Sequence, residues 1–477
     1  MASNSLFPEL DAAASSVEPS SSTPEETQPV GRPRLRSPDR LSVTLMTSDL
    51  DSLLPPDHNA RAVWLYVQRM DLTSLYDAIQ ARGSRAGRPC IDPRLPMALW
   101  LFATLEGVGS ARALDRLCSE HIAYRWLCGG VSVNYHSLAD FRVEHGALLE
   151  KLLVDGAATL LAGGLVDMAR VAQDGMRVRA HAGASSFKRR QTIERMRNLA
   201  REQVQRLRGQ LQGGDAQPPT PRQQSARQRA ARELEDRLDR ALEAMDEVEK
   251  APRRSKKKPK KAPPPKPEEG EAEPSQTEAE DKASAQRVSV TDPEVRVMKM
   301  ADGGFRPATN VQLAADVGTQ IILGVEVTNI GSDKAQMLPM LEQLEEHYGR
   351  RPGQMLVDNG FVRLDAIEQA EERGTEVIAP VQKPRDPTRD PYQPLKGDGD
   401  GVAAWRKRMG TDEAKATYIQ RGATIECING LLRNRGLQRF NVVGLLKQKA
   451  VVLWHALAHN LRRALILDPH LALGGGV

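Results

Sequence analysis

Aromatic residues make up only 4% of this 477-residue sequence, and cysteine occurs only four times. The cysteines have neither Cys-x2-Cys spacing nor a Cys/His ligand pattern, which argues against a zinc site and a disulfide framework; they are Cys90, Cys118, Cys128 and Cys427. No run of about 18 or more apolar residues occurs, so we expect no membrane-spanning helix. The first residues lack an apolar stretch behind a basic start, so we expect no secretory signal.

The sequence does contain enough apolar side chains for a sizeable core. Hydrophobic residues account for 40% of the chain and charged residues for 27%, a balance that is typical of a soluble protein. A length of 477 residues predicts two or three structural units. The net charge of +5 permits nucleic-acid binding without requiring it, because basic and acidic segments largely cancel.

Shifts in composition divide the chain into a tail, a helical domain, a core and an insertion. Residues 1–44 are rich in Ser, Pro and Glu and predict a disordered tail, and residues 45–160 predict the helical domain. The core is expected in two segments, 161–185 and 288–467. Between them, residues 186–287 predict an antiparallel helical hairpin followed by a low-complexity tether of Lys, Pro and Glu.

The helical domain is predicted to contain six helices, at residues 61–69, 72–80, 92–108, 110–121, 123–127 and 138–154. Ser137 is the expected N-cap of the last helix. Short helices separated by a glycine break suit a helix-turn-helix that places its last helix, with Arg142, in the major groove of DNA. A plain helical bundle that packs on the core explains the same pattern, and the sequence leaves both interpretations open.

The two core segments alternate strands and helices, which predicts an α/β fold. One strand is expected to end at Asp174 and another, at 354–357, to end at Asp358, so that both carboxylates project from strand ends. The remaining elements are predicted as strands at 295–300, 309–315, 320–327 and 376–379, helices at 333–348, 362–373, 418–440 and 445–467, and a loop at 383–410.

The helix at 418–440 carries the densest group of polar candidates. At 3.6 residues per turn, Glu426, Asn429 and Arg433 share one face, with Arg421 little more than a turn upstream. A carboxylate held among arginines suits a metal ion together with a phosphate backbone. An amphipathic helix with solvated charges would show the same pattern.

The candidate aspartates also have a structural interpretation. Asp174 precedes Gly175, and Asp358 begins an Asp-Asn-Gly sequence, so either could simply cap a turn. Asn429 is expected to pack or cap more than to hold a carboxylate. The other titratable candidates are expected to be structural: Asp302, Asp316, His455 and His459.

The order of Asp174, Asp358 and Glu426 along the chain resembles the catalytic triad of a DDE transposase. The stretch YIQRGATIECINGLLRNRGLQRF is similar to the Tyr-x2-Arg-x3-Glu-x6-Lys signature of insertion-sequence transposases, at Tyr418, Arg421, Glu426 and Arg433. Arg433 stands where Lys is usual, and four residues rather than three separate Arg421 from Glu426. The stretches VAQDGMRVRAHA and QMLVDNGF and residues 92–130 resemble the same family.

This resemblance implies a ribonuclease-H-like (integrase-type) catalytic core preceded by an all-α N-terminal DNA-binding domain. It also implies metal-dependent cleavage of DNA at the ends of a mobile element and strand transfer into target DNA. Asp174, Asp358 and Glu426 would together hold two Mg²⁺ ions, with Asp174 between them, and Mn²⁺ can substitute for Mg²⁺.

The resemblance further implies double-stranded DNA, as element ends and as target, for a partner. The expected DNA contacts are Tyr418, Arg421, Arg433, Arg435, Arg439 and Arg142. A homodimer or higher oligomer would hold two ends in a synaptic complex, at the nucleoid in the bacterial cytoplasm and without a membrane partner. The alternatives are an inactive or repurposed transposase that only binds DNA, and a nuclease of the same fold that joins no strands.

Overall fold

The computed structural model describes residues 49–82, 89–209, 221–250, 286–384, 386 and 388–468. The predicted tail at 1–44 and the low-complexity tether at 251–274 lie outside the described residues. All four cysteines are free thiols. Within the described ranges, no helix is both long enough and apolar enough to cross a membrane.

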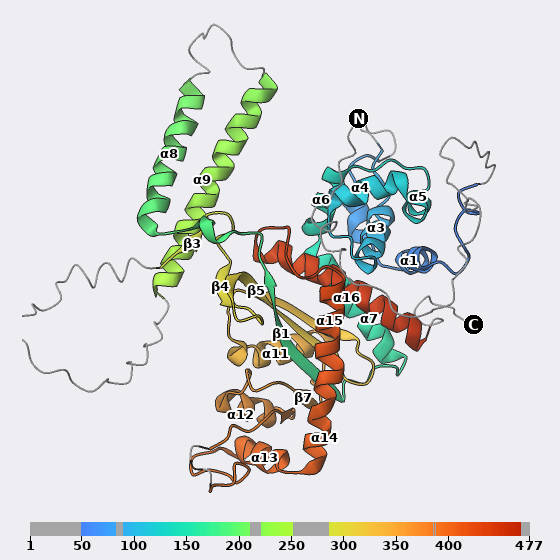
Figure 1. Cartoon of the computed structure of the whole chain (residues 1–477). Helices are drawn as coiled ribbons and strands as arrows, with labels where there is room; N and C mark the ends of the chain where they lie inside the picture. Colours follow the sequence, from blue (N-terminus) through green and yellow to red (C-terminus); the bar gives the residue numbers. More distant parts are fainter. Residues whose placement is uncertain are drawn as a thin grey trace, which may run out of the picture. The chain divides into compact units, whose positions relative to one another are not determined.

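The N-terminal part is helical, as predicted (Figure 1). Its helices are α1 Asn59–Val67, α2 Thr73–Asp77, α3 Arg94–Leu105, α4 Ala111–Glu120, α5 Ile122–Cys128, α6 Tyr135–Glu144 and α7 Gly146–Ala162. The single helix predicted at 138–154 is wrong, because the backbone of His145 leaves the helical conformation (φ −109°, ψ 34°) and separates α6 from α7. The predicted cap is also wrong: the Asn134 side chain caps α6 by accepting the Ser137 N–H at 3.0 Å.

A six-stranded mixed sheet forms the centre of the second part, so the predicted α/β class is confirmed. Its strands are β1 Arg170–Arg179, β4 Arg296–Lys299, β5 Phe305–Asp316, β6 Ile322–Thr328, β7 Gln354–Leu356 and β8 Glu376–Ile378. The order is β4-β5-β1-β7-β8, and β6 also pairs with β5. Strands β4, β6 and β1 run antiparallel to β5, whereas β7 is parallel to both β1 and β8. A separate two-stranded sheet pairs β2 Phe187–Lys188 with β3 Val288–Ser289.

Strand β1 differs from its prediction because it continues through Asp174 to Arg179. Asp174 pairs with Leu313 of β5 in mid-strand, so it does not cap a turn. Strand β7 pairs with β1 only as far as Ala172, which leaves one edge of β1 without a strand partner beyond that residue. At the far end, Arg179 forms an isolated bridge with Arg439.

Helices surround this sheet: α11 Met337–Tyr348, α12 Leu364–Glu372, α13 Asp400–Met409, α14 Asp412–Arg421, α15 Cys427–Asn434 and α16 Leu445–Leu467. The predicted loop at 383–410 is wrong at its end, since α13 occupies residues 400–409. The Glu368 carboxylate accepts the N–H groups of Gly401 and Val402 at the start of α13. Trp405 is fully buried and donates to the Ala379 carbonyl at 3.2 Å, so tertiary contacts stabilise a helix that begins in a glycine-rich sequence.

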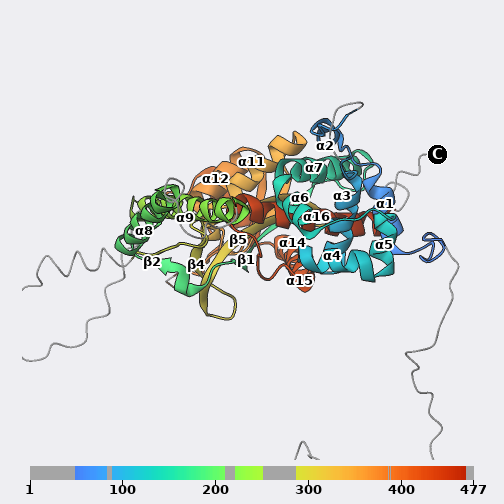
Figure 2. The same cartoon turned by 90° about the horizontal axis from the view of Figure 1, so that it is seen from above.

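The insertion contains the predicted pair of helices, α8 Arg190–Gly209 and α9 Pro221–Lys250 (Figure 2). Arg190 pairs with Asp246 and Glu249, and Arg201 pairs with Glu235 at 2.9 Å, which is the pattern of two antiparallel helices. A small apolar cluster lies between them, whereas Leu199 on α8 is 58% exposed.

Helix α16 connects the helical part to the sheet. The Trp454 side chain is fully buried and donates to the Arg142 carbonyl at 2.9 Å. Further along the helix, the Asn460 amide exchanges two hydrogen bonds with the backbone of Ile322 at the start of β6. Buried apolar side chains of both parts and of α16 belong to one hydrophobic core. Each large apolar side chain buried in it contributes about 1.5–3 kcal/mol to stability.

Candidate active site

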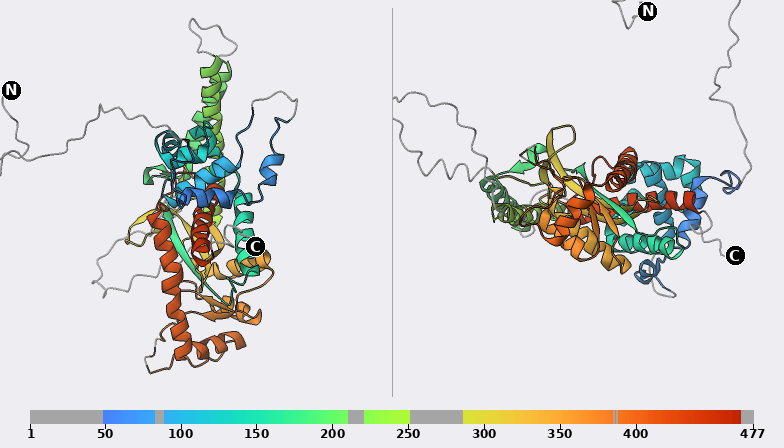
Figure 3. Two further views of the ribbon diagram at one scale, coloured as in Figure 1. Left: turned by 90° about the vertical axis from the view of Figure 1, so that its right-hand side faces the viewer. Right: turned by 90° about the horizontal axis from the view of Figure 1, so that it is seen from below.

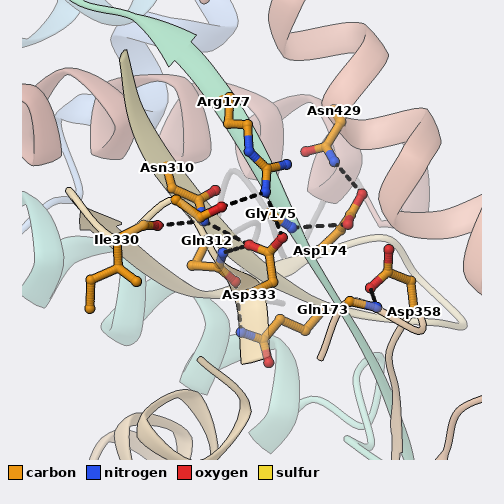
Figure 4. A network of polar contacts seen from close by, with 12 residues as sticks. Gln173, Asp174, Gly175, Arg177, Asn310, Gln312, Ile330, Asp333, Asp358 and Asn429 are labelled. Atoms are coloured by element: carbon orange, nitrogen blue, oxygen red, sulfur yellow. Dashed lines mark hydrogen bonds and ion pairs between the residues drawn. The ribbon is translucent and has the colours of Figure 1, made fainter. Parts of the chain in front are cut away.

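Asp174 and Asp358 lie side by side because of the register between β1 and β7. Arg170 pairs with Gln354 and Ala172 pairs with Leu356 in parallel orientation. Two further residues along this register bring Asp174 level with Asp358. Residues at the same level of neighbouring parallel strands project from the same face of a sheet. Figure 4 shows the two carboxylates next to each other. Asp358 lies just beyond the end of β7 at Leu356.

The third candidate lies on one continuous helical column formed by α14, a π-helical turn η3 at Gly422–Glu426, and α15. In the left view of Figure 3 this column runs beside β1. The predicted helix at 418–440 therefore begins earlier, at Asp412, and ends earlier, at Asn434. Ile425, Ile428 and Leu432 are fully buried, so the apolar face of this column packs into the core.

The π-helical turn accounts for the unusual spacing of the signature. A π-turn is a one-residue insertion into an α-helix, with hydrogen bonds from residue i to i+5. Four residues separate Arg421 from Glu426 where the family signature has three. The Arg421 Nη2 nevertheless donates to Glu426 Oε1 at 2.8 Å across five positions. The turn thus absorbs the extra residue and keeps both side chains on one face of the column.

Asp174 is held by three groups. Its Oδ1 accepts the Gly175 N–H at 2.9 Å, and its Oδ2 accepts the Asn429 Nδ2 at 2.9 Å. The Arg421 Nη1 lies 3.7 Å from Oδ1, so this buried guanidinium is placed between Asp174 and Glu426. Asn429 was expected to pack or cap, and that prediction is wrong, since it contacts the candidate carboxylate directly.

The environment of Asp174 makes its negative charge costly. The pKa of Asp174 is raised from 3.8 to about 6, mainly by burial and also by the nearby carboxylates of Asp358 and Asp333, against the opposing effect of Arg421. Asp358 contributes one oxygen that accepts the Gly360 N–H at 2.7 Å. Asp174 and Glu426 share the single guanidinium of Arg421, and Asp358 and Asp333 add negative charge beside Asp174, which is an arrangement that a cation would stabilise.

The carboxylates fit a divalent cation chemically. Among the residues that the structure describes, no three His, Cys, Asp or Glu side chains converge closely enough to hold a metal ion. The Glu426 side chain is 56% exposed and turns toward Arg421. Asp174 and Asp358 supply the hard oxygen ligands that Mg²⁺ and Mn²⁺ prefer, and the exposed Glu426 carboxylate is joined to Asp174 through Arg421.

The competing titratable residues have structural partners. Asp302 pairs with Arg306 at 2.7 Å across the β4–β5 turn. Asp316 is buried and accepts the Thr319 N–H and hydroxyl at 2.8 and 2.7 Å. Burial lowers the pKa of His455 to about 3 and that of His459 to about 4, so both are neutral core residues on α16, as expected.

The predicted DNA-contacting residues differ in accessibility. Arg433 and Arg439 are exposed, Tyr418 and Arg435 are half-buried, and Arg421 is buried against Asp174. Arg142 is only 5% exposed, stacks on Trp100 and donates to the Gly109 carbonyl at 2.6 Å. Arg142 therefore lies inside the protein and not on a surface that could enter a DNA groove. It lines a cavity of about 100 Å³ with Arg435 and His455.

Asp333 is the polar residue near this site that the sequence did not reveal. Its Oδ1 accepts the side-chain amides of Asn310 and Gln312 at 2.7 and 2.8 Å, and its Oδ2 accepts Arg177 Nη2 at 3.0 Å (Figure 4). This network lies against Gly175, on the face of β1 opposite Asp174. It connects the short turn before α11 to β1 and β5, and so fixes the strand that carries Asp174.

Gly175 is required by this network. A Cβ at residue 175 would overlap Asp333 Oδ1 and stand 2.5 Å from Gln312 Nε2, and both groups are held by hydrogen bonds. We expect Gly175→Ala to lower the free energy of unfolding by about 1–3 kcal/mol, the cost of overpacking, and to displace Asp174.

The matched control for Gly175 is Gly430 on α15, where an added Cβ would meet nothing within 4 Å. Gly430→Ala should stabilise the protein by about 0.5–1 kcal/mol, because alanine favours a helix interior. Urea unfolding of both variants measures the difference. Equal stability of Gly175→Ala and the wild type would contradict the steric argument.

Comparison with known protein families gives two matches. Residues 275–461 match the model described as transposase DDE domain, and residues 48–144 match the model described as transposase domain (DUF772). Asp358 and Glu426 lie within the first match, and Asp174 lies between the two. No curated protein and no solved structure matches the chain.

Proposed function

Because the chain belongs to the DDE transposases, we propose that Asp174, Asp358 and Glu426 are the catalytic residues with which it cuts element ends and transfers them into target DNA. The observation that carries this assignment is the register of β1 and β7, which puts Asp174 beside Asp358. The π-turn and the contact between Arg421 and Glu426 support the third residue.

We also infer a ribonuclease-H-like core at residues 161–185 and 288–467. The strand order supports this inference, since antiparallel β6 and β5 precede β1 in the sheet and parallel β7 and β8 follow it. Residues 45–160 would then form the DNA-binding domain, and residues 186–287 an insertion into the core. The helical character of residues 49–162 and the transposase match at 48–144 support that division.

The side chains suggest distinct roles in the reaction. Transposases of this family use divalent metal ions, and ions bound to these carboxylates would activate the attacking oxygen and stabilise the leaving one. Arg421 forms an ion pair with Glu426 in the free protein. When Glu426 turns to the substrate, Arg421 is free to contact the scissile phosphate. Asn429 orients Asp174 by donating to its Oδ2, and leaves Oδ1 toward Arg421.

Several finer features belong to the same proposal. Mg²⁺ is the expected ion, with Mn²⁺ as a substitute, because all three side chains offer carboxylate oxygens only. Tyr418, Arg433, Arg435 and Arg439 would contact the DNA backbone. Two element ends must be held together, which favours a homodimer or higher oligomer acting at the nucleoid in the bacterial cytoplasm.

Glu426→Gln tests the assignment most directly, since it keeps size and removes charge. With Mg²⁺ and DNA that carries the element's own ends, we expect nicking and strand joining to fall roughly 10²-fold, the typical cost of losing one group aimed at transition-state charge. Binding of the ends, measured in EDTA, should be unchanged or tighter. Electrophoresis of end-labelled DNA separates nicked from joined products.

The matched control is Glu413→Gln on α14, which is exposed and lies more than three turns before Glu426. It should join strands at the wild-type rate. If the wild type and Glu426→Gln both bind the ends but neither reacts, the chain only binds DNA. Wild-type nicking without joining would instead indicate a nuclease.

A further inference from the structure

An open cleft of about 760 Å³ begins at Gly175, the residue after Asp174. Its walls come from the second half of β1, the turn of the β4–β5 hairpin and the end of α15. Five basic residues and one acidic residue line it: Arg177, Arg179, Lys299, Arg306, Arg433 and Asp302. The lining therefore carries a strong excess of positive charge, and we call it the hairpin cleft.

Two of these five cations are already neutralised. Arg177 pairs with Asp333 at 3.0 Å, and Arg306 pairs with Asp302 at 2.7 Å. Arg179, Lys299 and Arg433 are all exposed, and within the described part of the chain none of their side chains has an acidic partner. Three unpaired cations around one cleft make it an attractive site for a polyanion.

The position of the cleft indicates which polyanion. It lies over the face of β1 opposite Asp174, and it also reaches Arg433 on α15. Arg433 follows Glu426 by seven residues on the same face of the helical column, a rise of about 10 Å. A nucleic-acid strand advances about 3.4 Å per nucleotide. A backbone with one phosphate beside Glu426 that runs along α15 would therefore bring another phosphate to Arg433 about three nucleotides away, at the entrance of the cleft.

The lining also indicates what part of the nucleic acid is bound. Its residues are Arg, Lys, Asp, Met, Ala, Gly and Gln, and among the described residues no aromatic ring lines it on which a base could stack. Cations that reach phosphates position a strand without reading its sequence.

We propose that the hairpin cleft binds the phosphodiester backbone of the DNA strand next to the scissile phosphate, through Arg179, Lys299 and Arg433. The proposal rests on the proposed catalytic role of Asp174. It adds the end of β1 and the β4–β5 hairpin to the DNA-binding surface, which the signature helix alone would place on α14 and α15.

The salt dependence of binding measures these contacts without any chemistry. The probe is a fluorescently labelled DNA duplex of arbitrary sequence, titrated in EDTA at about 50–300 mM KCl. Arg179→Gln, Lys299→Gln and Arg433→Gln should each reduce the slope of log K against log salt by about 0.9, and the triple variant by about 2–3. Arg350→Gln is the matched control, because Arg350 is exposed and precedes β7, at the opposite end of the sheet.

A second measurement places the contacts along the DNA. An element end is prepared with one neutral methylphosphonate linkage at successive positions beside the scissile phosphate. Neutral linkages within about three to five nucleotides on one side should weaken binding of the wild type and leave binding of the triple variant unchanged, which is the behaviour of a coupled pair.

Three outcomes would overturn the proposal: an unchanged slope in the triple variant, an equal loss in Arg350→Gln, or no position at which the variant and the neutral linkage are coupled. The catalytic proposal fails separately. If the variants show the expected slope changes but the wild type cuts no DNA, the catalytic proposal is disproved and the cleft remains a DNA-binding site.

Discussion

Replacing Asp174 with Asn is expected to abolish DNA cleavage and strand transfer while making the metal-free protein more stable at neutral pH. Activity should fall roughly 10³-fold or more, because the central carboxylate of the site is lost. Stability should rise because Asp174 is crowded by Asp358 and Asp333 and its side chain is only 19% exposed. A residue kept for structure would show the opposite change in stability.

The pH dependence of this gain follows from the raised pKa. The folded protein holds the Asp174 proton up to about pH 6, whereas the unfolded chain releases it near 3.8. Between these values the folded state binds more protons, so the stability of the wild type falls as pH rises. The amide introduced by Asp174→Asn does not titrate, and above pH 6 the variant should be more stable by about 2 kcal/mol. Below pH 4 the two proteins should unfold alike.

Urea unfolding in EDTA at pH 4 and pH 7.5 measures the difference, and Mg²⁺ should then stabilise the wild type more than Asp174→Asn. Glu345→Gln is the control, because that exposed carboxylate pairs with Arg351 and its pKa is lowered instead. It should keep full activity and gain no stability. If Asp174→Asn loses stability together with activity, Asp174 is a structural residue and the metal site lies elsewhere.

The sequence predicted those parts of the fold that depend on local pattern. Helix α16 was predicted at its observed bounds, because apolar residues recur at helical spacing throughout that stretch. The candidate carboxylates Asp174 and Asp358 were found through family signatures. Their proximity was expected for a different reason from the one observed, since Asp174 lies within a strand and not at its end. What joins them is a register between strands separated by about 180 residues, which no local pattern specifies.

The features that the sequence missed depend on tertiary contacts. Helix α13 begins in a glycine-rich stretch and is stabilised by Glu368, more than thirty residues earlier. Asp333 looked like an ordinary residue at a helix start, and its partners Arg177, Asn310 and Gln312 come from two other strands. At Arg142 the sequence suggested a function that tertiary contacts contradict. A basic residue on a short helix suited a DNA groove, but its contacts with Trp100 and Gly109 hold the Arg142 side chain inside the protein.

Single-residue deletions in the signature helix test the role of the π-turn. Deleting Ala423, which is exposed within η3, should convert that turn into an ordinary α-helix, because it removes the one extra residue. Arg421 and Glu426 would then be separated by three residues, as in the family signature, and would still face each other. We expect strand transfer within about tenfold of the wild type.

Deleting Cys427 instead is the matched control, since that exposed residue lies directly after η3. The helix can again lose its π-turn, so Arg421 and Asn429 keep their places. Glu426, however, moves into the position of Cys427 and turns away by about 100°. This variant should fold, judged by circular dichroism and urea unfolding, and should lose roughly 10³-fold in strand transfer. If both deletion variants keep strand transfer equally, Glu426 is not a catalytic residue. If both fold but are inactive, the π-turn itself is required.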